Sequence, residues 1–355
     1  MLRCSYNAQN VITLTKTTPT GDAVLLSLFN RRSGTNTQTG LSLSSDGIGL
    51  AAIHRQGHDA PPRLGHCEFI PAEVTEQAQL LQQLSNKHRL NKASCVSVAD
   101  NDSFSLLLVE APEVKPAELR AALRWKVKDL LPFHVDDAVI DVFDIPGQQQ
   151  RGRVQQMYVV ASRLSSVQEH ITLLEEHGVQ LAAIDIPELV LRNIAMLLPE
   201  AANGVAMLHI AADSGTLIIC RADVMYLTRN IKLGYRQLAN LLPLASGQDE
   251  FVLDEAEPTP EALLHAIDGI VLEIQRSLDY CESHFSLPPV ASLVLAPMFE
   301  EIPPLMPYLS SNLGIPVRML DLNAVLDCPQ HLDDALQSRC LLAIGAALRQ
   351  EERAL

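Results

Sequence analysis

The sequence lacks several features that would each point to a definite class of protein. No apolar run approaches the about 18–20 residues that a membrane-spanning helix needs, so no transmembrane segment is expected. The chain also lacks an excess of positive charge, since its formal net charge is −15. This charge argues against nonspecific attraction to nucleic acid or to an anionic membrane. No G-x-S-x-G elbow, H-E-x-x-H helix or Walker A loop occurs, which excludes the enzyme classes that those motifs identify.

The cysteines include no C-x-x-C pair and form no even-numbered framework. An odd, dispersed set of seven in apolar surroundings indicates buried thiols in a reducing cytosol, not disulfide bridges. The seven positions are Cys4, Cys67, Cys95, Cys220, Cys281, Cys328 and Cys340.

The bulk composition is that of an ordinary globular chain. Its 355 residues are 47% hydrophobic and 19% charged, which is enough to build a large core or two domains. Residues 1–23 differ because they are polar, threonine-rich and without the apolar region of a signal peptide. We expect this segment to be unstructured or a mis-annotated leader, with translation beginning at Val24. N-terminal sequencing of the native protein tests this, since a native chain beginning at Met1 would refute it.

Two stretches predict β-hairpins. Leu41–Ile53 alternates, breaks at Ser45-Asp46-Gly47 and alternates again, as expected of a hairpin with a glycine-containing turn. Val205–Leu227 repeats this pattern, with breaks at 212–215 and 221–223. Helical and strand patterns alternate after each hairpin, so we expect two related α/β halves.

Two helices are bounded by prolines. One is predicted from Pro116 to Pro132, and the longest begins at Thr259-Pro260-Glu261 and ends before Pro288-Pro289. The apolar face of the first comprises Leu119, Ala122, Leu123, Val127, Leu130 and Leu131. That of the longest comprises Leu263, Ile267, Ile270, Val271, Ile274, Leu278 and Cys281.

Between the two halves, residues 104–184 predict a small segment of mixed structure. It contains a helix, two strands around a polar turn, a second helix and a final strand. The second helix has a capping-box pattern at Ser166 and Glu169 and ends at Gly178. The two strands are predicted at Val139–Phe143 and Gln156–Ala161.

Four stretches carry a resemblance to a known family: RWKVKDLLPF at Arg124–Phe133, Leu173–Asn193, EIQRSLDY at Glu273–Tyr280 and LLAIGAALR at Leu341–Arg349. From Leu25 onward the chain resembles the PilM family of actin-like type IV pilus assembly proteins, and most closely its MshI branch from mannose-sensitive (MSHA) pilus systems. The resemblance implies an α/β, actin-like (ribonuclease H-like) ATPase fold with two lobes and an inserted small α+β subdomain.

The resemblance also implies a division of the chain. Residues 24–103 would form the first hairpin and helix of lobe 1, after the leader at 1–23. Residues 104–184 would form the inserted subdomain and the return to lobe 1, and residues 185–355 would form lobe 2 with the C-terminal helix.

The family's nucleotide site is expected at two hairpin loops, whose backbone N–H groups hold the phosphates while one aspartate from each loop organises Mg²⁺. In similar proteins both loops contain approximately Asp-Ile-Gly. Here the matching residues are Ser42-Leu43-Ser44 and His209-Ile210-Ala211, so both carboxylates and both glycines are replaced. The turn that would receive adenosine, Ala296–Phe299, also lacks its glycines. We therefore expect a degenerate ATPase without catalytic residues, cofactor or metal, in which ATP and Mg²⁺ are disfavoured.

An alternative keeps a shifted nucleotide site. Asp46, Asp213, Ser214, Gly215 and Thr216 would rebuild it, although Asx-Gly turns are common for purely backbone reasons. Together with the replaced loop positions, the candidate nucleotide-binding residues are Ser42, Ser44, Ser45, Asp46, His209, Ala211, Asp213, Ser214, Gly215 and Thr216.

Two further groups of polar residues are interpreted without assigning a site. His54, His58, His66 and Cys67 could ligate a metal, but their spacing fits no standard pattern, and solvated loop histidines are the expected account. The carboxylates Asp136, Asp137, Asp141 and Asp144 are expected on a solvated face. No metal site is predicted.

A basic stripe is a local exception in this acidic chain. Arg120, Arg124 and Lys128 recur every fourth residue of the helix that also contains Trp125, the only tryptophan. The stripe is either an ordinary solvent-facing flank or a docking surface for an acidic partner segment or lipid headgroups. Trp125 would belong to the core or would be an interface anchor.

The resemblance implies a cytoplasmic scaffold of a type IV pilus machine. Such a protein would bind the cytoplasmic N-terminal segment of a PilN/MshJ-like bitopic protein in a cleft beside the inserted subdomain, with the pilus motor ATPase as a further partner. It would lie at the inner face of the bacterial inner membrane without crossing it, and would bind no nucleic acid. The alternatives are an active actin-like ATPase that regulates pilus assembly and the GspL-like cytoplasmic domain of a type II secretion system.

Overall fold

The computed structural model describes residues 2–4, 14–16, 37–57, 60–115, 118–148, 154–242 and 260–350. The proposed start at Val24, together with Pro116, His58 and Thr259, lies outside these ranges. The chain divides into two compact units. Unit 1 comprises residues 1–193, 326–330 and 342–355, and unit 2 comprises residues 194–325 and 331–341. Two short strands, β1 (Leu2–Cys4) and β2 (Leu14–Lys16), pair antiparallel.

Unit 1 is built on a five-stranded sheet of order β10-β6-β3-β4-β5. The hairpin predicted at its start is confirmed, with β3 and β4 in antiparallel register around the turn at Ser45 and Asp46. The parallel strands β6 and β10 complete the other side. The strands are β3 (Thr37–Ser44), β4 (Gly47–His54), β5 (Arg63–Pro71), β6 (Cys95–Val98) and β10 (Leu181–Asp185).

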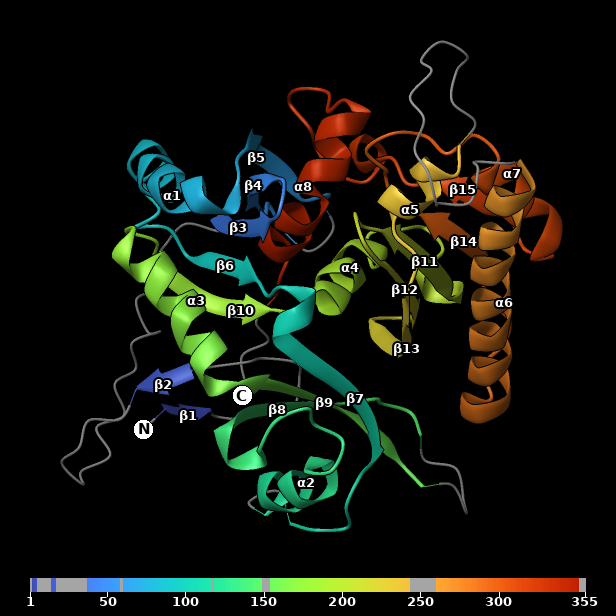
Figure 1. Cartoon of the computed structure of the whole chain (residues 1–355), viewed down its shortest axis with the longest axis horizontal. Helices are drawn as coiled ribbons and strands as arrows, with labels where there is room; N and C mark the ends of the chain where they lie inside the picture. The colour runs from blue at the N-terminus through green and yellow to red at the C-terminus, as the bar shows by residue number, and fades with distance from the viewer. Residues whose placement is uncertain are drawn as a thin grey trace, which may run out of the picture. The chain divides into compact units, whose positions relative to one another are not determined.

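Both faces of this sheet are buried. On one face, α1 (Val74–His88) and α3 (Leu164–Glu176) pack against it, and Leu41, Leu50, Leu81 and Leu174 share a core (Figure 1). On the other face, α4 (Pro187–Ala195) supplies Val190 to a second core with Val96 and Val98 of β6. Because side chains alternate along a strand, Cys95 joins the first core and Val96 the second.

The C-terminal helix α8 (Asp334–Ala347) reaches this sheet with its last residues, which belong to unit 1. A Cβ atom at Gly40 of β3 would lie 1.9 Å from the carbonyl oxygen of Ala343. Glycine is therefore required there, because the helix backbone packs directly against the strand.

The inserted subdomain of unit 1 is an antiparallel sheet of order β7-β9-β8 covered by one helix. The strands are β7 (Phe104–Glu110), β8 (Ala138–Asp144) and β9 (Gln156–Arg163), preceded by the short turns η1 (Asn101–Ser103) and η2 (Val135–Asp137), so both predicted strands are confirmed. Helix α2 (Leu119–Val127) lies against this sheet (Figure 1). Its Leu123 and Val127 share a core with Val109 and Val159 of the sheet.

Two helix boundaries were predicted wrongly. Helix α2 ends at Val127 instead of running to Pro132, and Leu130, expected on its apolar face, is 57% exposed. Helix α3 begins at Leu164 with Arg163 as its N-cap, so the capping box at Ser166 and Glu169 does not form. Ser166 and Glu169 lie inside the helix because α3 begins immediately after the last residue of β9. The local sequence contains no capping signal for that start.

Unit 2 contains a second five-stranded sheet, of order β13-β12-β11-β14-β15. As in unit 1, three antiparallel strands are followed by two parallel ones, which confirms the expected repetition of one pattern. The strands are β11 (Val205–Ile210), β12 (Gly215–Arg221), β13 (Val224–Ile231), β14 (Ser292–Leu295) and β15 (Val317–Met319).

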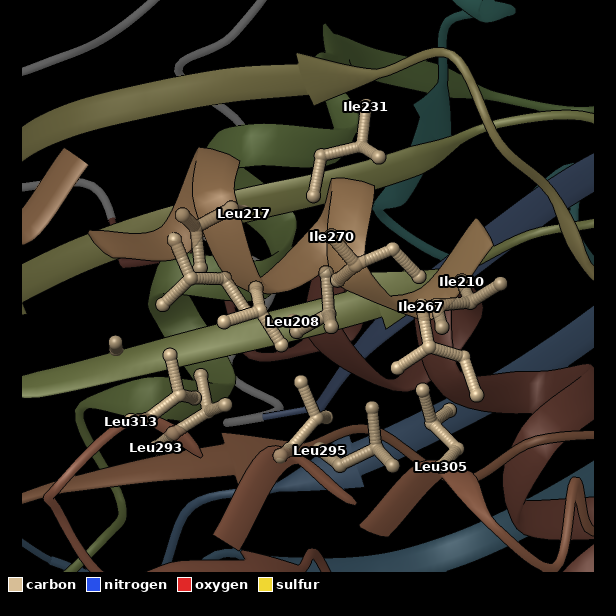
Figure 2. Close-up of a cluster of buried hydrophobic side chains, with 14 of the residues drawn as sticks. Leu208, Ile210, Leu217, Ile231, Ile267, Ile270, Leu293, Leu295, Leu305 and Leu313 are labelled. Atoms are coloured by element: carbon tan, nitrogen blue, oxygen red, sulfur yellow. The ribbon is translucent and has the colours of Figure 1, made fainter. Parts of the chain in front are cut away.

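Helices cover one face of this second sheet, and α6 (Pro260–Phe285) is the longest of those described. Its predicted apolar face is confirmed: Ile267 and Ile270 point toward Leu208 of β11 and Leu295 of β14 (Figure 2). Each fully buried Leu or Ile side chain contributes about 1.5–3 kcal/mol. The shorter elements are α5 (Tyr235–Asn240), α7 (Leu305–Asn312), η3 (Ala201–Asn203) and η4 (Leu322–Ala324).

Two expectations about the chain as a whole can be compared with the described part. No helix within it has the length and apolar character to cross a bilayer. Its cysteines form no disulfide with one another, namely Cys67, Cys95, Cys220, Cys281, Cys328 and Cys340. Burial raises the pKa of Cys95 and of Cys281 to about 12, so both remain protonated thiols at neutral pH.

Candidate functional site

The first loop expected to hold phosphate is the turn between β3 and β4 in unit 1. Ser42 is buried within β3, opposite Gly49 of β4, while Ser44, Ser45 and Asp46 are exposed. The Ser44 hydroxyl donates to the carbonyl of Gly47 at 3.2 Å, and the Ser45 hydroxyl donates to Oδ1 of Asp46 at 3.2 Å. The side chains of this turn therefore make contacts within the turn itself.

The backbone of the first loop is fixed by its neighbours. The buried Gln77 of α1 donates from Nε2 to the carbonyl of Ser44 at 2.6 Å, and the N–H of Ala72 donates to the carbonyl of Asp46 at 3.1 Å. Gly47 has a φ of +151°, and a Cβ atom there would lie 2.2 Å from the carbonyl oxygen of Ile70. One glycine is thus kept for packing against β5, while the position next to the expected phosphate, Ser44, carries a side chain.

The second loop joins β11 to β12 in unit 2. His209 of β11 pairs in register with Thr216 of β12, and the N–H of Ala211 donates to the carbonyl of Ser214 at 2.9 Å. Burial lowers the pKa of His209 to about 4, so its imidazole is neutral at neutral pH. A neutral ring cannot supply the negative charge that an aspartate would offer to Mg²⁺ at this position.

Asp213, the carboxylate of the second loop, faces an arginine. Nη1 of Arg236 lies 2.9 Å and 3.1 Å from the two carboxylate oxygens of Asp213. The same helix start, α5, donates its N–H groups to this loop: Tyr235 to the carbonyl of Ala211 at 2.8 Å and Arg236 to that of Ala212 at 3.0 Å. A phosphate would need these N–H groups as donors, and a cation would need the Asp213 carboxylate; both already make contacts within unit 2.

The second loop packs against the backbone of the turn that precedes α5. A Cβ atom at Gly234 would lie 2.3 Å from the carbonyl carbon of Asp213, so the turn before α5 touches the loop directly. The N–H of Gly234 is itself bound to Oε1 of Gln237 at 2.9 Å. Gly215 begins β12 and is buried.

The turn expected to receive adenosine follows β14 in unit 2, as predicted. Ala296 is fully buried and its N–H donates to the carbonyl of Leu208 at 2.8 Å, while Phe299 is 45% exposed. The guanidinium of Arg339 lies 4.4 Å from the centre of the Phe299 ring, and the ring of Tyr235 meets Phe299 edge-on at 6.4 Å. This turn therefore presents an aromatic side chain held by a cation–π contact.

The residues of the basic stripe on α2 lie in two different environments: Arg120 and Arg124 contact their own subdomain, whereas Lys128 lies beside the exposed Trp125. Arg124 donates to backbone carbonyls of its own subdomain, to Ala138 at 3.3 Å and to Val135 at 2.5 Å. Arg120 lies 3.8 Å from the buried carboxylate of Asp141. Trp125 is 73% exposed, and Lys128 lies over its ring at 4.9 Å. The core alternative for Trp125 is therefore wrong.

Buried ionisable groups in unit 1 were missed by the sequence analysis. Asp185, at the end of β10, is 2% exposed and forms an ion pair at 3.0 Å with Arg349, which is 4% exposed. Burial, aided by the charge of Asp185, raises the pKa of Glu188 to about 7. No pattern in the sequence pairs Asp185 with Arg349, because the two residues lie in separate segments of unit 1, with unit 2 between them in the chain.

Two polar groups do not lie where they were expected. Asp141, predicted on a solvated face, is buried in β8, and burial raises its pKa to about 6. His54 lies in β4, and His66 and Cys67 lie in β5, so they are not loop residues. Pairing between β4 and β5 decides the conformation of this stretch, and β5 forms although it contains Gly65.

The sequence was compared with known families and solved structures. A family model described as type IV pilus assembly protein PilM matches residues 72–351. No curated protein matches the sequence at a significant level.

Solved structures with a similar fold include a PilM–PilN type IV pilus biogenesis complex, with a TM-score of 0.66 and 21% identity over 88% of this chain and 97% of that chain. The cytoplasmic domain of EpsL, an inner-membrane component of the type II secretion system of Vibrio cholerae, gives a TM-score of 0.48 and 10% identity over 89% and 96%. A protein of unknown function with an actin-like ATPase fold from Bacteroides thetaiotaomicron gives 0.44 and 8% over 87% and 96%.

The predicted fold class is confirmed: the chain has the actin-like ATPase fold. The family match extends from the start of α1 to the C-terminal helix, across the inserted subdomain, strands β6 and β10 of the first sheet and the whole second sheet; β3, β4 and β5 precede it. It covers well over half of the sequence and agrees with the resemblance carried by its four stretches. The chain belongs to the PilM family of type IV pilus assembly proteins.

Proposed function

We propose that this protein is a cytoplasmic scaffold of an MSHA-like type IV pilus machine, which binds the cytoplasmic N-terminal segment of a PilN/MshJ-like inner-membrane protein without hydrolysing ATP. The family match carries the proposal. The likeness to the PilM–PilN complex supports it, since that complex contains a PilN partner and the similarity covers 97% of the matched chain. The protein would be held at the inner face of the inner membrane through this partner, with the pilus motor ATPase as a further contact.

The contacts of the two loops support the absence of hydrolysis. Phosphoryl transfer depends on neutralising the charge of the phosphates, for which the fold would need a cation held by carboxylates. Asp213 is paired with Arg236, His209 is neutral, and the carbonyl of Ser44 is bound by Gln77. These three groups are therefore neutral or bound within their own units, and Asp46 accepts a hydrogen bond from the Ser45 hydroxyl.

The exposed surface at the C-terminal end of α2 is the proposed partner surface; it includes Trp125 in the last turn of the helix and Lys128 and Leu130 just after it. Trp125 and Leu130, five residues apart in the chain, are large apolar side chains that are 73% and 57% exposed. Arg120 and Arg124, proposed earlier as partner contacts, support the subdomain from within. A short peptide with apolar anchors and acidic flanking groups would match an aromatic anchor beside a lysine.

Trp125 makes this proposal directly measurable, because it is the only tryptophan of the chain. Synthetic N-terminal peptides from candidate inner-membrane partners are titrated into the full-length protein while tryptophan emission is recorded. A saturable blue shift is expected, since the peptide would remove water from the indole. Binding of labelled peptide to Trp125→Ala should weaken about 30-fold, equivalent to about 2 kcal/mol.

The matched control is Leu272→Ala. Leu272 is an exposed apolar residue of α6 in unit 2, so its removal should leave peptide affinity unchanged. Each titration is repeated with Mg²⁺ and ATP, and the affinity should not change. Failure of every peptide to bind would refute the scaffold, and peptide binding that requires ATP together with release of phosphate would favour the active ATPase instead.

A further inference from the structure

Two histidines and a glutamate converge at the end of α1 in unit 1. Nε2 of His66 lies 3.2 Å from Oε1 of Glu68, and Nε2 of His88 lies 2.5 Å from the same oxygen. The two imidazole rings are 4.3 Å apart, and the three side-chain atoms all lie within 4.8 Å of one another. None of these residues belongs to the loops or to the α2 surface on which the proposed function rests.

The fold brings these residues together for simple geometric reasons. Cross-strand partners share a face, and Glu68 of β5 pairs with Leu50 of β4, whose side chain packs against α1. His66 is two residues from Glu68 and therefore lies on the same face. His88 ends α1 one turn after Leu84, which lies in the same core as Leu50. The group thus lies where the apolar core beneath α1 gives way to solvent.

We propose that His66, Glu68 and His88 form a binding site for a divalent transition-metal ion of the zinc class. Two imidazoles and one carboxylate are a ligand set that zinc uses with a fourth position left open. With zinc–ligand distances of about 2.0–2.1 Å, tetrahedral ligands stand about 3.3 Å apart. The His66–Glu68 separation of 3.2 Å already has this value, and His88 would withdraw by about 1 Å.

The surroundings of the three side chains favour a cation. His66 Nε2 is buried and lacks a well-aligned hydrogen bond, so metal coordination would satisfy it. The ammonium of Lys87 binds the other carboxylate oxygen of Glu68 at 2.6 Å and competes with a metal for its charge. A bound ion would fasten the end of α1 to the edge strand β5.

The test is calorimetric titration of ZnCl₂ into full-length protein that has been treated with a chelator. One equivalent should bind, and His66→Gln and His88→Gln should each weaken binding about 100-fold, because even indirect support of a zinc ligand is worth about 10–100-fold. Lys87→Gln should strengthen binding about fivefold by removing a competing positive charge. These opposite signs on neighbouring residues of α1 are not expected of general damage to the helix.

The matched control is His134→Gln, which removes an imidazole 3.5 Å from the carboxylate of Asp136 but with no second histidine in that pair. Its zinc affinity should equal that of the unchanged protein. Circular dichroism and unfolding without metal confirm that each variant folds, and His88→Gln, at a helix end, serves if His66→Gln does not.

Cobalt replaces zinc in a parallel titration, because a thiolate ligand would add a sulfur-to-cobalt charge-transfer band. Cobalt bands without that signature support the site. The proposal is overturned if no saturable binding occurs, if His88→Gln weakens binding no more than His134→Gln, or if the thiolate band is present. Peptide binding plays no part in the measurement, so its outcome is separate from that of the scaffold proposal.

Discussion

The two five-stranded sheets have the same strand order but differ in the chemistry at their ends. In unit 1 the last strand, β10, ends at Asp185, which is buried against Arg349. In unit 2 the last strand, β15, ends at Met319 and continues into the buried, apolar Leu320. In both sheets the end of this strand is hydrogen-bonded to its neighbour, through Ala99 to Asp185 and through Leu320 to Leu295.

The loops of the two sheets differ as well. The first is fixed by a side chain of α1, Gln77, and the second by the backbone N–H groups at the start of α5 and by Arg236. The same topology therefore tolerates different residues at its strand ends and turns. Retention of the actin-like fold is, for this reason, separable from retention of phosphate chemistry.

Among the changes that test the difference between the two sheets, breaking the buried ion pair of unit 1 should cause the largest loss in the free energy of unfolding. Arg349→Met leaves the carboxylate of Asp185 buried without its partner, and we expect a loss of about 3–5 kcal/mol in the free energy of unfolding. Urea unfolding measures the loss, and amide exchange should show it in β3, β6 and β10 of unit 1.

Ile270→Ala provides the counterpart in unit 2, because it removes an apolar side chain from a core without charges. A loss of about 2–5 kcal/mol is expected, with exchange increased in β11, β12 and β14. Adding Asp185→Asn to Arg349→Met should recover part of the stability in unit 1. No recovery would mean that the lost packing of Arg349, and not the orphaned charge, causes the effect.

Buried ionisable groups of the two units should contribute to the pH dependence of stability with opposite signs, because burial raises the pKa of Glu188 in unit 1 to about 7 and lowers that of His209 in unit 2 to about 4. The pKa of Glu188 is raised from 4.5 to about 7, so the folded protein binds more protons than the unfolded chain between these values. The contribution of Glu188 to stability should therefore fall by about 2–3 kcal/mol as pH rises through this window, and Asp141 acts in the same direction with a pKa of about 6. His209 acts in the opposite direction between its lowered pKa of about 4 and the ordinary value of 6.5.

Glu188→Gln should remove the contribution of Glu188, so that stability falls less as pH rises than in the unchanged protein, in urea unfolding measured between about pH 5 and pH 8. Glu175→Gln, which changes an exposed carboxylate of α3, should leave the profile unchanged. A profile that keeps its slope in Glu188→Gln would show that another group carries the proton.

The surface ion pair of the second loop should give the smallest effect. Arg236→Ala removes the partner of Asp213, and a loss of at most about 1 kcal/mol is expected because both side chains are largely exposed. Differential scanning calorimetry measures it. A loss of more than about 2 kcal/mol would mean that this loop depends on the pair more than an exposed contact allows.

Local sequence patterns were enough to predict some hairpins and helices. Alternation around Ser45–Gly47 and the apolar stripe of α6 were enough to place a hairpin and the longest described helix, because both signals lie within one stretch of chain. The predicted end of α2 was wrong because it relied on Pro132, whereas the helix ends at Val127, about one turn earlier.

Contacts between distant stretches could not be predicted in this way. Asp185 and Arg349, or Glu68 and His88, become neighbours only after sheet register and helix packing are fixed. Asp141 was misjudged for the same reason, since alternation cannot tell which face of a strand a subdomain covers. For the candidate nucleotide loops, the sequence showed which residues were replaced but not that Gln77 and Arg236 bind what remains.

The most direct test of the central claim is a titration of the full-length protein with Mg²⁺ and ATP, followed by thermal unfolding and by phosphate release. We predict no shift of the unfolding midpoint, because ligand that binds only the folded state would raise it. We also predict no phosphate release above buffer. A saturable, Mg²⁺-dependent rise in the midpoint with steady phosphate release, both lost in Asp213→Ala, would show that the loops still hold and cleave a nucleotide.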